Sequence, residues 1–151
     1  MERDKLLDCV IFKGLDVEEL DSVLSCGREV VFQNNGVILE ESSIKEGADL
    51  FFIQSGMVRV ELEAAVEKEA KRLAILKRGD VFGEMGLLKG RRRSARVVAY
   101  GGAVHAIQFN GQKLYELFER YNHIGYLVMH NLASILSDRL IDVNFMWRDD
   151  I

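Results

Sequence analysis

The chain has few of the residues that build disulfide frameworks, zinc sites or membrane spans. Only two of its 151 residues are cysteine, and Cys9 and Cys26 are too few for a disulfide framework or a zinc site. We therefore expect both to be reduced, buried thiols. The charged start of the chain is not followed by the apolar region of a signal peptide, and no run approaches the roughly 20 apolar residues of a membrane-spanning helix. These absences predict a cytoplasmic protein.

Positive charge is not in excess either. The chain has 20 lysines and arginines against 24 aspartates and glutamates, which gives a formal net charge of -4. This balance argues against a nucleic-acid partner, because such affinity comes largely from neutralising phosphates. A basic run does occur at residues 89–96. A run of this kind is typical of a solvated hairpin tip, where its field attracts anionic ligands.

Histidine is scarce and scattered. The chain has three histidines, His105, His123 and His130, and none of them stands with a carboxylate at the spacing of metal ligands. We therefore expect no metal centre, no cofactor and no enzymatic activity.

Apolar residues are plentiful enough for one core. They make up 48% of the chain, and no linker-like composition divides it. We expect a single domain over residues 1–151, with a helical N-terminal segment at 1–28, a β region at 29–109 and C-terminal helices at 110–147.

The β region contains short β-branched and aromatic runs that are separated by Gly, Asn and Asp. Many short strands at this spacing indicate a sandwich or barrel, so the fold class is mainly β with flanking helices. Gly56 predicts a tight hairpin between strands at 50–53 and 58–62. The charged stretch 61–72 predicts an exposed hairpin tip or a short helix.

Three signals predict helix starts and ends. Asp16 and Glu19 have the spacing of a capping box, and Asn110 can cap a second helix. After a break at 121–122, apolar residues spaced by three and four predict a long helix that reaches residue 147. Its first turns are expected to dock on the β region. The rest of its apolar stripe extends further than a small barrel can cover, and a homodimer contact between such helices is the alternative to docking.

The most informative segment is FGEMGLLKGRRRSARV, residues 82–97. Two glycines around Glu84 let backbone amides approach an anion. Arg93 can grip phosphate oxygens in a planar fork, while the carboxylate of Glu84 can accept two hydroxyl hydrogen bonds from a sugar. Together these groups match a ribose that carries a phosphate.

This segment closely resembles the phosphate-binding cassette of the cyclic nucleotide-binding domain family, found in catabolite-activator-type regulators, kinase regulatory subunits and cyclic-nucleotide-gated channels. The resemblance covers roughly residues 10 to 145. It implies a double-stranded β-helix (jelly-roll) barrel with N-terminal helices and a long C-terminal helix. Two features depart from the family pattern: the loop at 40–46 lacks the usual glycine, and the chain has no proline.

The resemblance also implies roles for residues. Glu84 would bind the ribose 2′-hydroxyl and Arg93 the cyclic phosphate. The remaining pocket residues implied by the family are those beside the glutamate and the arginine, namely Gly83, Met85, Gly86, Ser94 and Ala95. In the family the final helix caps the base, and the nearest polar candidates on it are Ser134, Ser137, Asp138 and Arg139; whether they face the pocket or solvent is left open.

The function expected from this resemblance is a cyclic-nucleotide sensor whose C-terminal helix responds to the ligand. Ser94 stands where relatives that prefer cyclic GMP often carry threonine, which favours cyclic AMP and leaves cyclic GMP and other messengers open. The alternative is a ligand-free interaction or dimerisation module on the same fold. Too few residues follow the long helix for a DNA-binding domain, so we expect an unknown effector protein, the dimer itself or a further part of a longer protein to carry the output.

Overall fold

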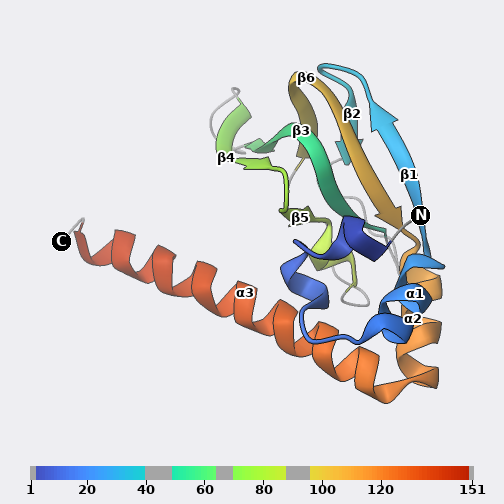
Figure 1. Ribbon diagram of the computed structural model, residues 1–151. Coiled ribbons are helices and arrows are strands. Elements are labelled where there is room, and N and C mark those ends of the chain that lie inside the picture. The colour runs from blue at the N-terminus through green and yellow to red at the C-terminus, as the bar shows by residue number, and fades with distance from the viewer. Residues whose placement is uncertain (1–2, 40–48, 64–69, 88–95, 150–151) are drawn as a thin grey trace.

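The computed structural model describes residues 3–39, 49–63, 70–87 and 96–149. Three N-terminal elements precede the sheet, and two longer helices follow it (Figure 1). The N-terminal elements are η1 (Arg3–Leu6), η2 (Val10–Phe12) and α1 (Val17–Leu24). The C-terminal helices are α2 (Gly111–Arg120) and α3 (Asn122–Asp149).

The predicted capping box is confirmed at the start of α1. The side chain of Asp16 accepts a hydrogen bond from the backbone of Glu19, and the side chain of Glu19 accepts one from the backbone of Asp16. Before α1, the predicted helical N-terminal segment forms two short 3₁₀ turns, η1 and η2. The second of them buries Ile11 and Phe12. Asn110 caps α2 as predicted, by accepting from the backbone of Lys113.

The strands form one antiparallel sheet. Its hydrogen-bonded order is β1-β6-β3-β4, with β2 also paired to β6 and β5 to β3. The six strands are β1 (Gly27–Phe32), β2 (Val37–Leu39), β3 (Leu50–Glu63), β4 (Ala70–Lys77), β5 (Val81–Phe82) and β6 (Arg96–Phe109). Within the described residues no pairing joins β1 to β4, so the pairing shows a mainly antiparallel β fold and not a closed barrel.

The predicted hairpin at Gly56 is wrong. Gly56 lies inside β3, a single strand of 14 residues, and the register against β6 shifts on either side of it. Its φ of +92° is a conformation that suits glycine in a bulge as well as in a turn. A Cβ here would lie 2.5 Å from the carbonyl oxygen of Ala103 in β6, so glycine also permits the close approach of the two strands.

The charged stretch 61–72 contains more β-strand than the expected exposed hairpin tip or short helix. The strand β3 continues to Glu63 and β4 starts at Ala70, and residues 64–69 between them lie outside the described residues. Glu61 is only 6% exposed, which contradicts the expectation of an exposed position. Its Oε1 lies 2.5 Å from Nε of Arg59, and the Arg59 guanidinium lies over the ring of Tyr100. A partner with opposite charge is what allows a carboxylate to be buried.

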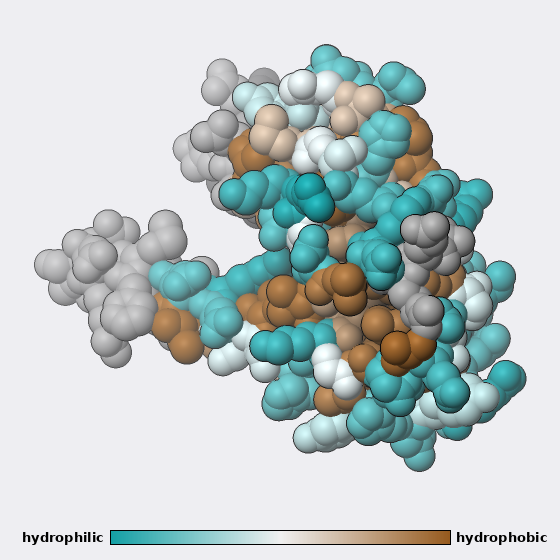
Figure 2. Space-filling view, viewed as in Figure 1, coloured by the Kyte–Doolittle hydropathy of each residue, from teal (hydrophilic) through white to brown (hydrophobic). Residues whose placement is uncertain are grey.

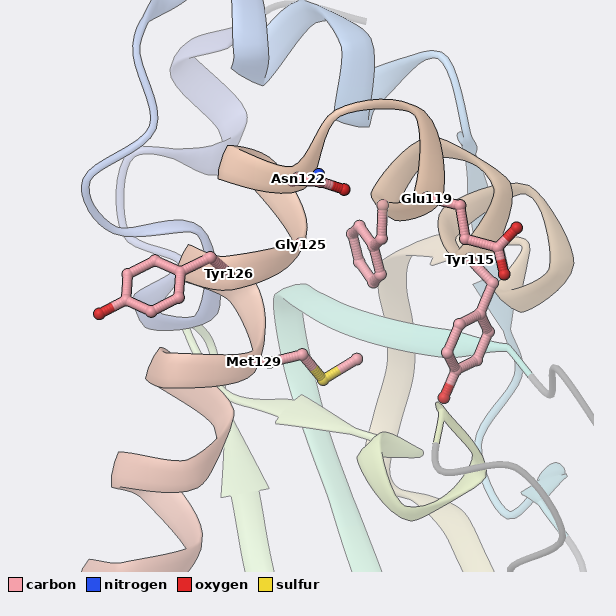
Figure 3. A pocket seen from close by; sticks show the side chains of 7 residues that line it. Tyr115, Glu119, Asn122, Gly125, Tyr126 and Met129 are labelled. Carbon is pink, nitrogen blue, oxygen red and sulfur yellow. The ribbon is translucent and has the colours of Figure 1, made fainter.

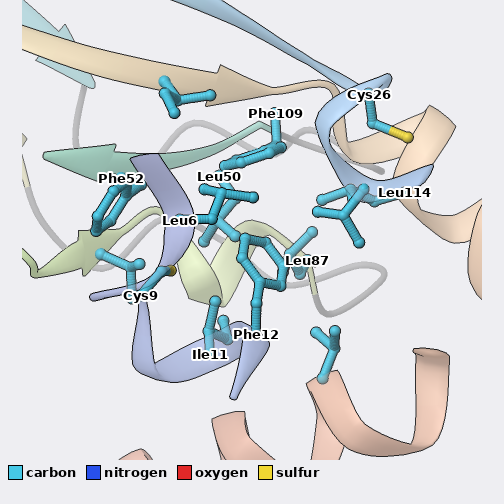
Figure 4. Packing of buried hydrophobic residues seen from close by; sticks show 14 of the residues in the cluster. Leu6, Cys9, Ile11, Phe12, Cys26, Leu50, Phe52, Leu87, Phe109 and Leu114 are labelled. Atoms are coloured by element: carbon cyan, nitrogen blue, oxygen red, sulfur yellow. The ribbon is translucent and has the colours of Figure 1, made fainter. Parts of the chain in front are cut away.

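Two hydrophobic clusters hold these elements together. The larger one joins the N-terminal turns, the ends of β3 and β6, and both C-terminal helices, and Figure 4 shows its centre. In it the ring of Phe12 meets that of Phe109 edge to face, with centroids 5.2 Å apart. The smaller cluster lies within the sheet and contains Phe51, Phe82 and Val97.

The two C-terminal helices meet closely at Gly125. A Cβ at this position would lie 2.9 Å from Cβ of Phe118, so a larger residue would force α2 and α3 apart. Asn131, six positions further along α3, donates two hydrogen bonds from its amide to the carbonyl oxygens of Ile11 and Lys13. The helix α3 is therefore fixed to both α2 and η2. None of the described helices is long and apolar enough to cross a membrane.

Candidate nucleotide-binding site

The carboxylate of Glu84 is placed by the elements on both sides of it. Before it, β5 pairs with β3, and the ring of Phe82 stacks on that of Phe51 with centroids 5.0 Å apart. Gly83 then turns the chain with a φ of +84°, and Glu84 begins the 3₁₀ turn η3 (Glu84–Leu87). Leu87 at the end of η3 is fully buried in the larger cluster. The turn is thus held by apolar contacts on each side.

Glu84 itself is buried and paired with α3. It is 8% exposed, and its Oε1 lies 2.5 Å from Nη1 of Arg139. The two residues are 55 positions apart in the sequence. The contact therefore brings the long helix to the glutamate of the Phe-Gly-Glu motif. Of the four polar residues of α3 that the family resemblance offers as base contacts, Arg139 is the one that makes a side-chain contact with this motif.

The other three predicted base contacts on α3 have different surroundings. Ser134 donates its hydroxyl hydrogen bond to the carbonyl oxygen of His130 in its own helix. Ser137 and Asp138 are exposed. Their predicted contact with a base stays a prediction.

The remaining predicted pocket residues fall into two groups. Met85 and Gly86 lie within η3 together with Glu84. Arg93, Ser94 and Ala95 belong to residues 88–95, which lie outside the described residues. The approach of Glu84 to Arg93 therefore stays a prediction, whereas the approach of Glu84 to Arg139 is observed.

Two contacts that fix α3 have no signal in the sequence. His123 at the start of α3 pairs through Nδ1 with Oε2 of Glu19, at 2.5 Å, and Asn131 binds η2 further along. Neither partner is near in sequence, and a single polar residue on a helix does not reveal what it faces. Both contacts hold the part of α3 that precedes Arg139.

The cysteines are buried free thiols, as predicted. Burial raises the pKa of Cys9 from 9.0 to about 12 and also raises the pKa of Cys26. Because the reactive form of cysteine is the thiolate, neither thiol is suited to act as a nucleophile. Within the described part of the chain, no group of His, Cys, Asp and Glu can hold a metal ion.

A separate hollow lies between α2 and α3. It has a volume of about 430 Å³, and Figure 3 shows Met129 reaching from α3 toward the side of Tyr115, while Tyr126 points away from α2. Its lining residues are Tyr115, Phe118, Glu119, Asn122, Gly125, Tyr126 and Met129. None of them belongs to the predicted nucleotide site.

Comparison with known proteins identifies the family. The chain is 33% identical over 130 residues to the cyclic AMP receptor protein of Thermus thermophilus, a match that covers 86% of this chain and 56% of that protein. It is 34% identical over 145 residues to glutaminase 1 of Bradyrhizobium diazoefficiens, which covers 95% of this chain and 22% of that protein. The chain thus spans about half the length of the first relative and about a fifth of the second.

The solved structures agree with the sequence matches. The crystal structure of Thermus thermophilus catabolite activator protein superposes with a TM-score of 0.76 at 29% identity, over 92% of this chain and 62% of that one. The profile of the cyclic nucleotide-binding domain matches residues 29–121, well over half of the chain. This chain belongs to the cyclic nucleotide-binding domain family.

Proposed function

We propose that the chain is a sensor module that binds a cyclic nucleotide, with cyclic AMP as the first candidate. In this proposal Glu84 accepts the ribose 2′-hydroxyl, and Arg93 binds the cyclic phosphate. Backbone groups of Gly83, Met85 and Gly86, with Ser94 and Ala95, complete the pocket. The name of the Thermus relative, a cyclic AMP receptor protein, supports the choice of ligand.

The observation that carries this proposal is the burial of Glu84. A carboxylate that is 8% exposed is costly unless hydrogen-bond donors surround it. Arg139 supplies a donor to Oε1, and a ribose hydroxyl is a suitable donor for the second oxygen. A ligand that bridges the glutamate and α3 would favour one position of that helix by its differential affinity.

Calorimetric titration with cyclic AMP and cyclic GMP tests the proposal. We expect micromolar binding of cyclic AMP, its loss in Arg93→Ala and a weaker affinity in Glu84→Ala. Arg28→Gln is a matched control, since it removes one arginine charge from β1 and should leave the affinity unchanged. If nucleotide-free protein gives no heat with either nucleotide, the ligand-free interaction module is the better description.

We also propose that the far part of α3 mediates a homodimer. Leu140 and Ile141 are 62% and 48% exposed, and Figure 2 shows hydrophobic atoms on the part of α3 that projects from the sheet. Analytical ultracentrifugation should find a dimer that Leu140→Asp converts to a monomer. A monomer at all concentrations of the unchanged chain would contradict this.

The remaining parts of the proposal concern the barrel, the cellular location and the effector protein. We propose that the sheet belongs to a jelly-roll barrel, and that the module works in the cytoplasm by regulating an effector protein without catalysis of its own. Fractionation of cells that express the protein, followed by detection of partners that co-purify only with cyclic nucleotide present, tests the localisation and the effector together.

A further inference from the structure

We propose that the hollow between α2 and α3 is a docking site for an arginine side chain of a partner protein. This surface is distinct from the predicted nucleotide site, because the two share no residue. Three of its features favour such an occupant: an apolar floor, tyrosines gathered where the two helices join, and a carboxylate that no basic group of the described residues neutralises. Together they match a guanidinium on an apolar stem.

The floor of the hollow is apolar. The helices α2 and α3 touch at Phe118 and Gly125, which both line the hollow, and the space of about 430 Å³ opens beside this contact. Phe118 is 8% exposed, and Met129 reaches in from α3 toward the side of Tyr115 (Figure 3). Clefts that bind ligands have volumes of roughly 300 to 1,000 Å³, so a long side chain fits in this one.

Tyrosines gather where α2 and α3 join. Three of the four tyrosines in the chain lie between residues 115 and 126. Tyr121 is 51% exposed and Tyr126 is 66% exposed, although a phenol ring presents a large apolar surface to water. Tyrosine and arginine are over-represented among the residues that carry the binding energy of protein interfaces. The exposed rings therefore favour a protein partner over a small metabolite.

The carboxylate of the hollow belongs to Glu119, the charged residue among its lining side chains. Glu119 is exposed, and it makes no hydrogen bond or ion pair within the part of the chain that the structure describes. It follows Tyr115 by four positions on α2, a spacing that brings side chains of a helix next to each other. An arginine that enters the hollow would therefore meet an aromatic ring and a carboxylate together.

The sheet of the same chain shows how such groups hold an arginine. The guanidinium of Arg59 lies 5.5 Å from the centre of the Tyr100 ring, and its Nε lies 2.5 Å from Oε1 of Glu61. The ring face and the carboxylate bind one guanidinium between them. The hollow presents tyrosine and glutamate without an arginine among its lining residues. An arginine from a partner would complete the same combination of groups.

Charge favours a different protein over a second copy of this chain. The formal net charge is -4, so a second copy would be repelled from Glu119, whereas a basic segment would be attracted. The apolar stem of an arginine can pack on Phe118 and Met129 while its head stays at the carboxylate. Lysine suits the hollow less well, because its ammonium cannot bind a carboxylate through two parallel hydrogen bonds.

Selection from a phage-displayed library of random peptides, on the full chain without nucleotide, tests the docking site. We expect the enriched peptides to share an arginine next to an apolar residue. For the most enriched peptide, Glu119→Gln should weaken binding by about tenfold or more, because a hydrogen bond between charged groups is lost. Citrulline in place of the arginine of the peptide should weaken binding similarly, since it removes the charge and keeps the shape.

Two controls locate the bound peptide. Glu116→Gln changes an exposed glutamate of the same helix that does not line the hollow, so it should leave the affinity unchanged. In nuclear magnetic resonance spectra of the chain with labelled methionine methyl groups, the signal of Met129 should shift when the peptide is added. The signal of Met57, which is 38% exposed on β3, should stay in place.

Four results would overturn the inference. The first is a selection that enriches no peptide, or peptides without arginine. The second is an affinity that Glu119→Gln leaves unchanged. The third is a peptide that shifts the signal of Met57 and not that of Met129, because it binds elsewhere. The fourth is a dimer of the unchanged chain that Glu119→Lys converts to a monomer in the analytical ultracentrifuge, because the hollow then holds a second copy.

Discussion

Residues 122–132 and residues 133–142 belong to one continuous helix, α3, but different interactions hold them. The first part places Ile124, Val128 and Leu132 in the larger core cluster and adds the two hydrogen bonds of Asn131. In the second part Leu136 packs only partly buried against the same cluster, Leu140 and Ile141 are largely exposed, and Arg139 joins the helix to Glu84. Continuous secondary structure therefore does not imply uniform stability.

This difference matters for the proposed sensor function, because segments with few buried contacts move at low cost in free energy. The Glu84–Arg139 pair is open to solvent on the arginine side only, since the Arg139 side chain is 46% exposed and that of Glu84 11%. Such a pair can favour one helix position over another, because a two-state element responds to small differential energies. In the proposed sensor, the first part of α3 would be the fixed support and the second the part that responds.

The largest expected effect comes from removing core volume from the first part. Leu132 is 2% exposed, so Leu132→Ala should lower the free energy of unfolding by about 2 to 5 kcal/mol through lost burial and the cavity left behind. Urea denaturation followed by circular dichroism measures this loss. A change under about 0.5 kcal/mol would show that this part of α3 is not docked in solution.

A smaller loss is expected at the contact with η2. Asn131→Asp removes both amide donors and sets a carboxylate against the carbonyl oxygens of Ile11 and Lys13, which should cost about 1 to 3 kcal/mol. Ser134→Ala is the control, because its hydroxyl bonds only within the helix and its loss should stay within about 0.5 kcal/mol. Equal losses of stability in the two variants would show that the contact of Asn131 with η2 does not stabilise the fold.

Alkaline pH should weaken the core next to the first part of α3. The folded-state pKa of Cys9 is raised from 9.0 to about 12, so the folded protein keeps a proton that the unfolded chain releases. Its contribution to stability is complete below pH 9 and is lost as pH rises toward 12, by at most about 1.4 kcal/mol per pH unit. Unfolding at pH 8.5 and pH 10 should show this loss, and Cys9→Ala should reduce it. An identical pH slope in Cys9→Ala would assign the loss to other groups.

The smallest effect is expected in the second part of α3. Leu140 is 62% exposed, so Leu140→Ala should change the free energy of unfolding of the dilute chain by less than about 0.5 kcal/mol. The same substitution should matter more at high protein concentration if the helix dimerises. A loss near that of Leu132→Ala in dilute protein would mean that both parts of α3 are packed alike.

The sequence predicts features that depend on neighbouring residues. The capping box at Asp16 and the cap at Asn110 are confirmed because a cap needs only a side chain and a backbone amide three positions away. The hairpin at Gly56 is wrong because a positive φ serves turns and bulges alike, and the choice depends on the distant strand β6. The residues around Gly56 therefore do not distinguish a turn from a bulge.

For the candidate site, too, the local turn can be predicted from the sequence, whereas the distant partner of Glu84 cannot. The position of Glu84 in a turn after β5 follows from the Phe-Gly-Glu motif, but its partner does not. Arg139 is 55 positions away, and the rotation of α3 that brings it to Glu84 is set by the packing of Ile124, Val128 and Leu132. Helix periodicity reveals which residues share a face and not what that face meets.

The anchor at Leu132 and Asn131 has a mechanical consequence. Leu132 is the last buried side chain along the described part of α3, and Asn131 binds η2, so a tilt of the helix would begin beyond them. Arg139 lies seven positions after Leu132, about 10 Å along the helix at 1.5 Å per residue. Each degree of tilt there would displace the guanidinium sideways by only about 0.2 Å, so the ion pair with Glu84 would survive small tilts and break at larger ones.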